Sequence, residues 1–207
     1  MWDSTASSVT TRLNAVRLGI FAGIFTCLAY PLLVFLPLPR VATAALAACI
    51  GPALGLASYG LKTLLDLERS TVSSALGLLL NSLAGAMFSA MLLVQLAVKA
   101  LAQDQKVAPP LAGVWLGLDV AWDAYVGLGT LFFAVAMLRH PRFGRAFAYS
   151  GLAIAVSLLA LNFYTFPTPP GSAGLIDLGP AAGLWYLIVT IQTWRSMAWA
   201  KGRAASV

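Results

Sequence analysis

The sequence predicts an all-α, polytopic membrane protein with six transmembrane helices in one domain and both termini in the cytoplasm. Three observations predict this class. Of the 207 residues, 60% are hydrophobic and only 10% are charged, a balance that a soluble domain of this size could not hide from water. The apolar residues form six runs of membrane-spanning length. The basic residues are distributed unevenly among the segments between these runs.

Polar and turn-forming residues separate the expected spans. The spans cover residues 18–38, 41–61, 72–98, 111–138, 147–166 and 179–200. The first run is longer than the apolar core of about 7–15 residues in a cleaved signal peptide, so we expect it to be retained. In the second run, Gly51 and Pro52 should loosen or kink the helix. Pro109 and Pro110 suit the entry to the fourth run, since proline is tolerated in a first helical turn, and Gly179-Pro180 opens the sixth run.

The basic residues predict the orientation. With the N-terminus in the cytoplasm, ten basic residues lie on the inner side: Arg12, Arg17, Lys62, Arg69, Arg139, Arg142, Arg145, Arg195, Lys201 and Arg203. Three lie outside: Arg40, Lys99 and Lys106. This asymmetry follows the positive-inside rule, and it requires all six runs to span the membrane. It also explains the net charge of +6 without a nucleic-acid partner.

Several kinds of chemistry are disfavoured by composition. The chain has one histidine, His140, so zinc clusters and haem held by two histidines are not expected within it. Cys27 and Cys49 lie inside apolar runs, which favours small packing residues over a disulfide. There is no glycine-rich phosphate loop after a strand. We therefore predict no cofactor and no metal site, and an enzyme is less favoured than a binding protein.

The candidate site lies in the run 111–138, the only apolar run that contains carboxylates. Asp119 and Asp123 are one helical turn apart and share a face with Trp115 and Trp122. Carboxylates beside indole rings suit a cation, and a buried carboxylate can carry a proton. The alternative is that the acids make an internal polar contact or face the headgroups, with the tryptophans as interfacial anchors.

The expected depth of the two acids in the membrane helps to choose between a ligand site and a contact with the headgroups. Counting about 20 residues back from Arg139 places the outer membrane boundary near Asp119 and Asp123 about 6 Å inside it. A charge at the boundary needs no function, so Asp123 becomes the key residue. The same count places Asn162 and Gln95 in this outer layer. The predicted ligand-binding residues are Asp123, Asp119, Trp122, Asn162, Gln95, Tyr164 and Trp185.

Three further features have two interpretations each. Asp177 could reach the mouth of such a site, but an acid before a helix start is favoured as a cap. The basic loop with Arg139, His140, Arg142 and Arg145 could bind anionic lipid, although orientation alone explains it. Four glycine pairs at GxxxG spacing predict close helix packing within the chain or, less favoured, with a second copy or a partner subunit: Gly19/Gly23, Gly51/Gly55, Gly113/Gly117 and Gly179/Gly183.

The C-terminal half carries a resemblance. The pattern Asp-Ala-Tyr-Val-Gly-Leu-Gly-Thr-Leu-Phe-Phe from Asp123, then Pro-Arg-Phe-Gly-Arg from Pro141, Gly151, and Gly-Leu-Trp-Tyr from Gly183 resembles a family of six-span bacterial membrane proteins classified as a domain of unknown function. The resemblance implies six helices and a bacterial cell membrane, and no activity. Asp123 stands where we would expect a histidine in that pattern, so no functional residue is carried over.

The leading hypothesis is a protein that binds or transports a small cationic or proton-coupled ligand entering from the outer face. The alternative is a structural or accessory subunit that packs through its glycine-rich faces against a larger membrane complex. A membrane enzyme acting on lipid ranks third, and it would require polar residues to converge near Gln192 and Arg195. In each case the first partner is the lipid bilayer.

Overall fold

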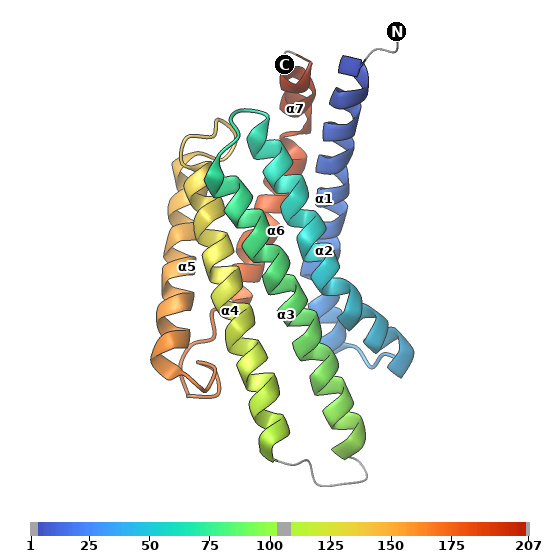
Figure 1. Cartoon of the computed structure of the whole chain (residues 1–207), viewed down its shortest axis with the longest axis vertical. Helices are drawn as coiled ribbons and strands as arrows, with labels where there is room; N and C mark the ends of the chain where they lie inside the picture. Colours follow the sequence, from blue (N-terminus) through green and yellow to red (C-terminus); the bar gives the residue numbers. More distant parts are fainter. Residues whose placement is uncertain (1–3, 103–108, 206–207) are drawn as a thin grey trace.

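The chain folds into α-helices throughout the part that the computed structural model describes, which is residues 4–102 and 109–205 (Figure 1). Its helices are α1 (Ser4–Phe35), α2 (Arg40–Asp66), α3 (Val72–Ala102), α4 (Pro109–Met137), α5 (Gly144–Thr165), α6 (Gly179–Arg195) and α7 (Met197–Ala204). No strand occurs among these residues. The predicted all-α class is confirmed, and Lys106 lies outside the described residues.

Five of these helices, α1 to α5, are long and apolar enough to cross a membrane. The first helix begins at Ser4, well before the apolar run, because its polar N-terminal residues continue the helix. The sixth run is not one helix to residue 200, because α6 has 17 residues and ends at Arg195. The Ser196 hydroxyl donates to the Gln192 carbonyl there, and α7 begins after this turn.

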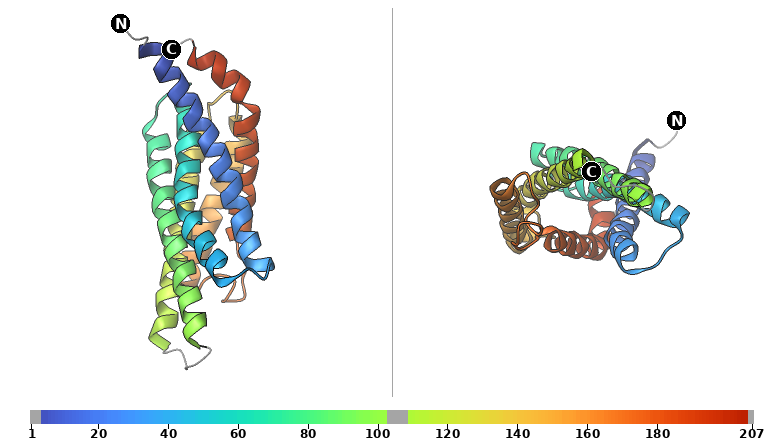
Figure 2. Two further views of the ribbon diagram at one scale, coloured as in Figure 1. Left: turned by 90° about the vertical axis from the view of Figure 1, so that its right-hand side faces the viewer. Right: turned by 90° about the horizontal axis from the view of Figure 1, so that it is seen from below.

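The long helices run alternately up and down and form a ring (Figure 2). Each helix from α1 to α6 packs against the next one along the chain, and α6 packs against α1. The start of α1 lies with α7 and the α2–α3 and α4–α5 connections at one end, the upper end in Figure 1. We call this the α7 end and the opposite one the far end. The alternation is the one that the sequence predicts.

Small residues allow two close helix contacts. A Cβ added to Gly19 would lie 2.5 Å from the Gly60 Cα, so α1 and α2 touch through their backbones. In the same way Gly51 of α2 lies against the Gly85 backbone of α3. The predicted intramolecular packing therefore applies to the glycines of α1 and α2. In contrast, a Cβ on Gly113, Gly117 or Gly183 would meet no atom within 4 Å.

Pro52 lies inside α2 and has no N–H, so the backbone hydrogen bond to the carbonyl four residues earlier is missing, as expected. Ser89 of α3 enters the gap: the Gly51 N–H donates to its Oγ at 2.9 Å, and this hydroxyl donates to the Ala47 carbonyl at 2.8 Å. The Ala48 carbonyl, which Pro52 leaves without its helical donor, lies 3.3 Å from the same oxygen. A hydroxyl from the neighbouring helix thus satisfies the freed groups where no water is available.

The α4–α5 connection is fastened to the α6–α7 junction. The Gln192 side-chain amide donates to the Arg142 carbonyl, and Arg142 Nε donates to Ser196 Oγ at 3.4 Å. His140 is only 4% exposed and lies between the rings of Phe143 and Trp199, with centroids 5.3 and 5.2 Å away. Burial lowers the pKa of His140, so the histidine of this basic loop is a packed, neutral side chain.

Candidate functional site

Asp123 of α4 lies inside the bundle with 5% of its surface exposed, and it faces α5. Asn162 of α5, which is fully buried, lies close enough for its side-chain amide to act on the carboxylate. The Asn162 amide also donates to the Leu158 carbonyl at 3.0 Å, while its Oδ1 has no hydrogen-bond partner. An amide carbonyl buried without a donor can accept from a bound water.

Two other acids lie toward the far end. Asp119 is half-buried one turn from Asp123, and Asp177 is exposed on the α5–α6 connection. Both are close enough for their charges to act on Asp123. Asp177 Oδ1 accepts the Gly179 N–H at 2.8 Å just before the first turn of α6, while the N-cap residue itself is Leu178, which makes no side-chain cap bond. The predicted acid at the helix start is thus present, one residue before the N-cap. Among the described residues, no lysine or arginine forms an ion pair with any of these acids.

The remaining predicted site residues lie apart from this group. Trp122 packs on Phe88 of α3, with ring centroids 4.4 Å apart. Gln95 lines a separate cavity of about 270 Å³ between α1, α2 and α3. Tyr164 is 83% exposed, and Trp185 is buried against α5, where its Nε1 donates to Ser150 Oγ at 3.2 Å. Asp123 and Asn162, which were predicted to lie at the same depth in the membrane, do lie close together. The other residues do not join them, because the depth of a residue says nothing about the side of the helix on which it lies.

A second polar cluster at the centre of the bundle is absent from the sequence prediction. The Asn81 amide of α3 donates to the Tyr186 hydroxyl of α6 at 2.7 Å, and that hydroxyl lies 2.9 Å from Thr130 Oγ1 of α4. Thr130 donates its own proton to the Val126 carbonyl at 2.7 Å. The Tyr186 proton therefore points to Thr130, and the chain of donors runs from Asn81 through Tyr186 to Thr130. We call these three residues the central polar cluster.

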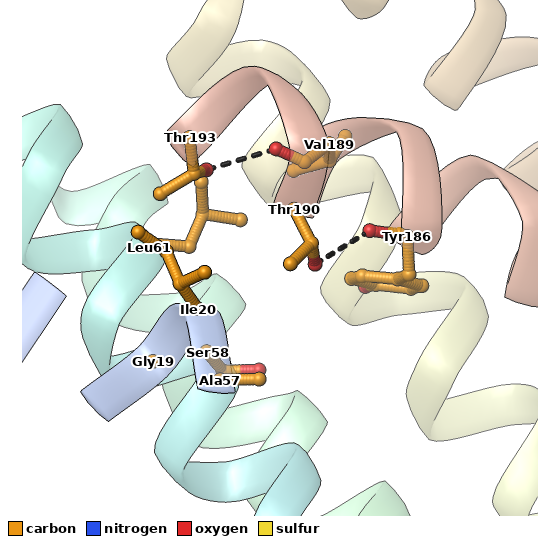
Figure 3. A pocket seen from close by; sticks show the side chains of 9 residues that line it. All are labelled: Gly19, Ile20, Ala57, Ser58, Leu61, Tyr186, Val189, Thr190 and Thr193. Carbon is orange, nitrogen blue, oxygen red and sulfur yellow. Dashed lines mark hydrogen bonds between the residues drawn. The ribbon is translucent and has the colours of Figure 1, made fainter. Parts of the chain in front are cut away.

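Beside the central polar cluster lies a small cavity of about 20 Å³ between α1, α2 and α6 (Figure 3). It is lined by Gly19, Ile20, Ala57, Ser58, Leu61, Tyr186, Val189, Thr190 and Thr193. The hydroxyls of Thr190 and Thr193 bond to carbonyls of their own helix, at 2.8 and 2.9 Å (Figure 3). Ser58 Oγ is buried without a partner. The volume and this free hydroxyl fit about one water molecule.

An apolar layer separates Asp123 and Asn162 from the central polar cluster. It consists of Leu54, Ala84, Val126 and Leu158, one from each of α2 to α5, with Leu178 of the α5–α6 connection packed against them. Val126 lies between Asp123 and Thr130 on α4, which are about 10 Å apart along the helix. The interior is thus polar at two levels and closed between them.

The acids are not arranged as a metal cage. Within the described residues, no group of three or more histidine, cysteine or acidic side chains is placed to hold a metal ion. Among the described residues the arrangement offers one buried carboxyl group, Asp123, close to the Asn162 amide, with further acids toward the far end. Such a group can bind and release a proton or a small monovalent cation.

In comparisons of the chain with protein-family models, with curated proteins and with solved structures, nothing matches.

Proposed function

We propose that this protein binds a proton or small monovalent cation at Asp123 and carries it across the membrane, with the outer face at the far end. The observation that carries the proposal is the burial of Asp123 close to Asn162, with no ion pair to a basic residue in the described part of the chain. A charged carboxylate at the centre of a membrane-spanning helix costs about 2.5–3.5 kcal/mol on the lower insertion scales, and a buried carboxylate one turn inside the boundary bears part of this cost. A proton or a bound cation removes that charge, so exchange of either is the chemistry this position favours.

The surroundings supply an entry route and a barrier. Asp119 and Asp177 lie toward the far end and would raise the local concentration of cations at the mouth. On the other side, the apolar layer around Val126 blocks direct passage to the central polar cluster. Opening of this layer would join Asp123 to Tyr186 and the small cavity beside Ser58. A closed layer between two polar levels is what an exchanger needs to prevent a continuous leak.

The proposed topology has six spans, with α6 as the sixth and the α7 end in the cytoplasm. A helix of 17 residues is about 25 Å long, slightly less than the hydrocarbon thickness of about 30 Å. Its ends would be accommodated by local thinning and by its flanking residues. The arginines at the α7 end, among them Arg139, Arg142 and Arg145, support the cytoplasmic assignment of that end.

The test is proton movement in proteoliposomes that contain a pH-sensitive dye, with imposed gradients of Na⁺, K⁺ or H⁺. We expect Asp123→Asn to abolish the protein-dependent flux, since the amide cannot exchange a proton. Asp119→Asn is the matched control: it removes the same charge from the same helix face at a half-buried position, and it should retain most of the flux. Equal flux in wild type and Asp123→Asn would refute the proposal.

The alternative proposal is an accessory subunit of a larger membrane complex. Two observations favour it: the interior is closed at the apolar layer, and Gly113, Gly117 and Gly183 present faces that no described residue covers. Co-purification in mild detergent tests it, with Gly117→Leu and Gly183→Leu as variants. Loss of a co-purifying protein without loss of thermal stability would favour this role, whereas a wild-type protein that purifies alone would exclude it.

A further inference from the structure

A cavity of about 590 Å³ lies at the α7 end, where the end of α2, the start of α3 and the end of α4 meet. Its volume is within the range of small-molecule sites, about 300–1,000 Å³. The lining has two parts. Arg69, Thr71, Ser73 and Arg139 provide a basic and polar part, and Val135 and Ala136 of α4 belong to an apolar part. The site is separate from Asp123, which lies more than three turns away on α4.

The polar part of the lining has a net positive charge. Arg69 and Arg139 are exposed side chains, and neither forms an ion pair with another described residue. The one acid of the lining, Glu68, is paired with Arg203 of α7 at 3.3 Å. Two guanidinium groups therefore remain for an external anion, and the hydroxyls of Thr71 and Ser73 lie in the same lining. Guanidinium forks match phosphate oxygens in geometry.

The apolar part shows what kind of anion fits. Val135 is 37% exposed on α4, one turn below Arg139, so the lining continues from the basic part onto an apolar helix surface. Leu65 and Leu138 extend this apolar part. A free phosphate ion would fill only the basic part. A phospholipid would place its phosphate between the arginines and its first methylene groups over Val135 and Ala136.

We propose that this cavity binds the headgroup of an anionic phospholipid of the cytoplasmic leaflet, held by Arg69 and Arg139. The amphipathic lining and the basic charge left after the Glu68–Arg203 pair both fit this ligand. The basic loop then has a specific lipid contact at Arg139, in addition to its role in orientation.

Native mass spectrometry of the purified protein in detergent tests the proposal, with phosphatidylglycerol and phosphatidylcholine of identical acyl chains added in equal amounts. We expect the wild type to retain phosphatidylglycerol with about a tenfold preference. The double variant Arg69→Gln/Arg139→Gln should reduce this preference to about one. The matched control, Arg145→Gln/Arg195→Gln, removes the same charge from exposed positions outside the cavity and should keep the preference.

Two further arms separate the sources of the anion. Ala136→Phe fills the apolar part without changing charge, and we expect it to lower phosphatidylglycerol retention while leaving thermal stability near that of the wild type. Glycerol phosphate, added as a headgroup without chains, should not displace the lipid at equal concentration. Efficient displacement by glycerol phosphate would overturn the lipid assignment in favour of a small-anion site. Equal loss of preference in the Arg145/Arg195 control would overturn the cavity itself.

Discussion

Asp123 and His140 are both buried titratable side chains, exposed by 5% and 4%, but their surroundings are of opposite kinds. His140 at the α7 end lies between two aromatic rings, accepts the Arg142 N–H at 3.3 Å on Nδ1, and has both Glu68 and Arg142 nearby. Asp123 toward the far end has an amide partner and two further acids. His140 is held by ring packing and by one hydrogen bond on Nδ1, while its Nε2 is buried without a hydrogen-bond partner. Asp123 has two further acids nearby and no ion pair to a basic residue among the described residues.

This difference separates a structural residue from a functional candidate. A side chain held mainly by packing, such as His140, contributes to the free energy of unfolding through that packing. A side chain that is buried without compensation is retained at a cost, which a function in binding would explain. The two residues should therefore respond in opposite ways to substitution.

The largest effect is expected for His140→Ala. The substitution leaves a void between Phe143 and Trp199 and removes the acceptor for the Arg142 N–H, so the free energy of unfolding should fall by about 2–4 kcal/mol. Denaturant titration in mixed micelles measures it. Ion flux per folded molecule should not change. A variant as stable as the wild type would contradict the packing role of the ring.

The central polar cluster should give a smaller effect. Tyr186→Phe leaves the Asn81 amide without its acceptor and removes the bond to Thr130, at an expected cost of about 1–2 kcal/mol. Tyr149→Phe is the matched control, because Tyr149 is 60% exposed and should lose almost nothing. If both substitutions have the same small effect, the cluster does not hold α3, α4 and α6 together.

The sequence predicts much of the fold because apolar runs, turn residues and basic asymmetry are local signals. Two boundaries differ for physical reasons. The helical extension from Ser4 has no hydrophobic signal, and the end of α6 depends on Ser196, whose hydroxyl accepts from Arg142 in a distant connection. Neither the start of α1 nor the end of α6 can therefore be predicted from the apolar pattern of its own segment.

The candidate site could be predicted only in part. The expected depth of each residue in the membrane selected Asp123 and Asn162, and these two residues lie close together in the structure. Gln95 is at a comparable depth on a face of α3 directed to α1 and α2, and depth carries no information about rotation. The sequence did not predict the central polar cluster, because Asn81, Thr130 and Tyr186 are each common residue types in a membrane helix. Only their convergence from three helices makes them a cluster.

The stability of the protein should also depend on pH through His140. Burial lowers the pKa of His140 below its ordinary value of 6.5, so the unfolded chain takes up a proton at a higher pH than the native one. Stability is therefore full above pH 6.5 and falls as the pH decreases from 6.5 toward the native pKa, by at most about 1.4 kcal/mol per pH unit. The difference between wild type and His140→Gln, measured from pH 7.5 to about 5, isolates this contribution. Parallel curves would show that the native ring binds its proton as easily as the unfolded one.

The smallest effect on stability is expected for Asp123→Asn. The amide has nearly the same shape and removes a buried charge that forms no ion pair with a described basic residue. The free energy of unfolding should therefore stay within about 0.5 kcal/mol of the wild type or rise. Thermal and denaturant unfolding of the purified variant measure this alongside the flux assay. A stable but inactive variant would assign Asp123 to function. A loss of stability as large as that of His140→Ala would instead show that the carboxylate holds α4 against α5, and the two buried residues would then be of the same kind.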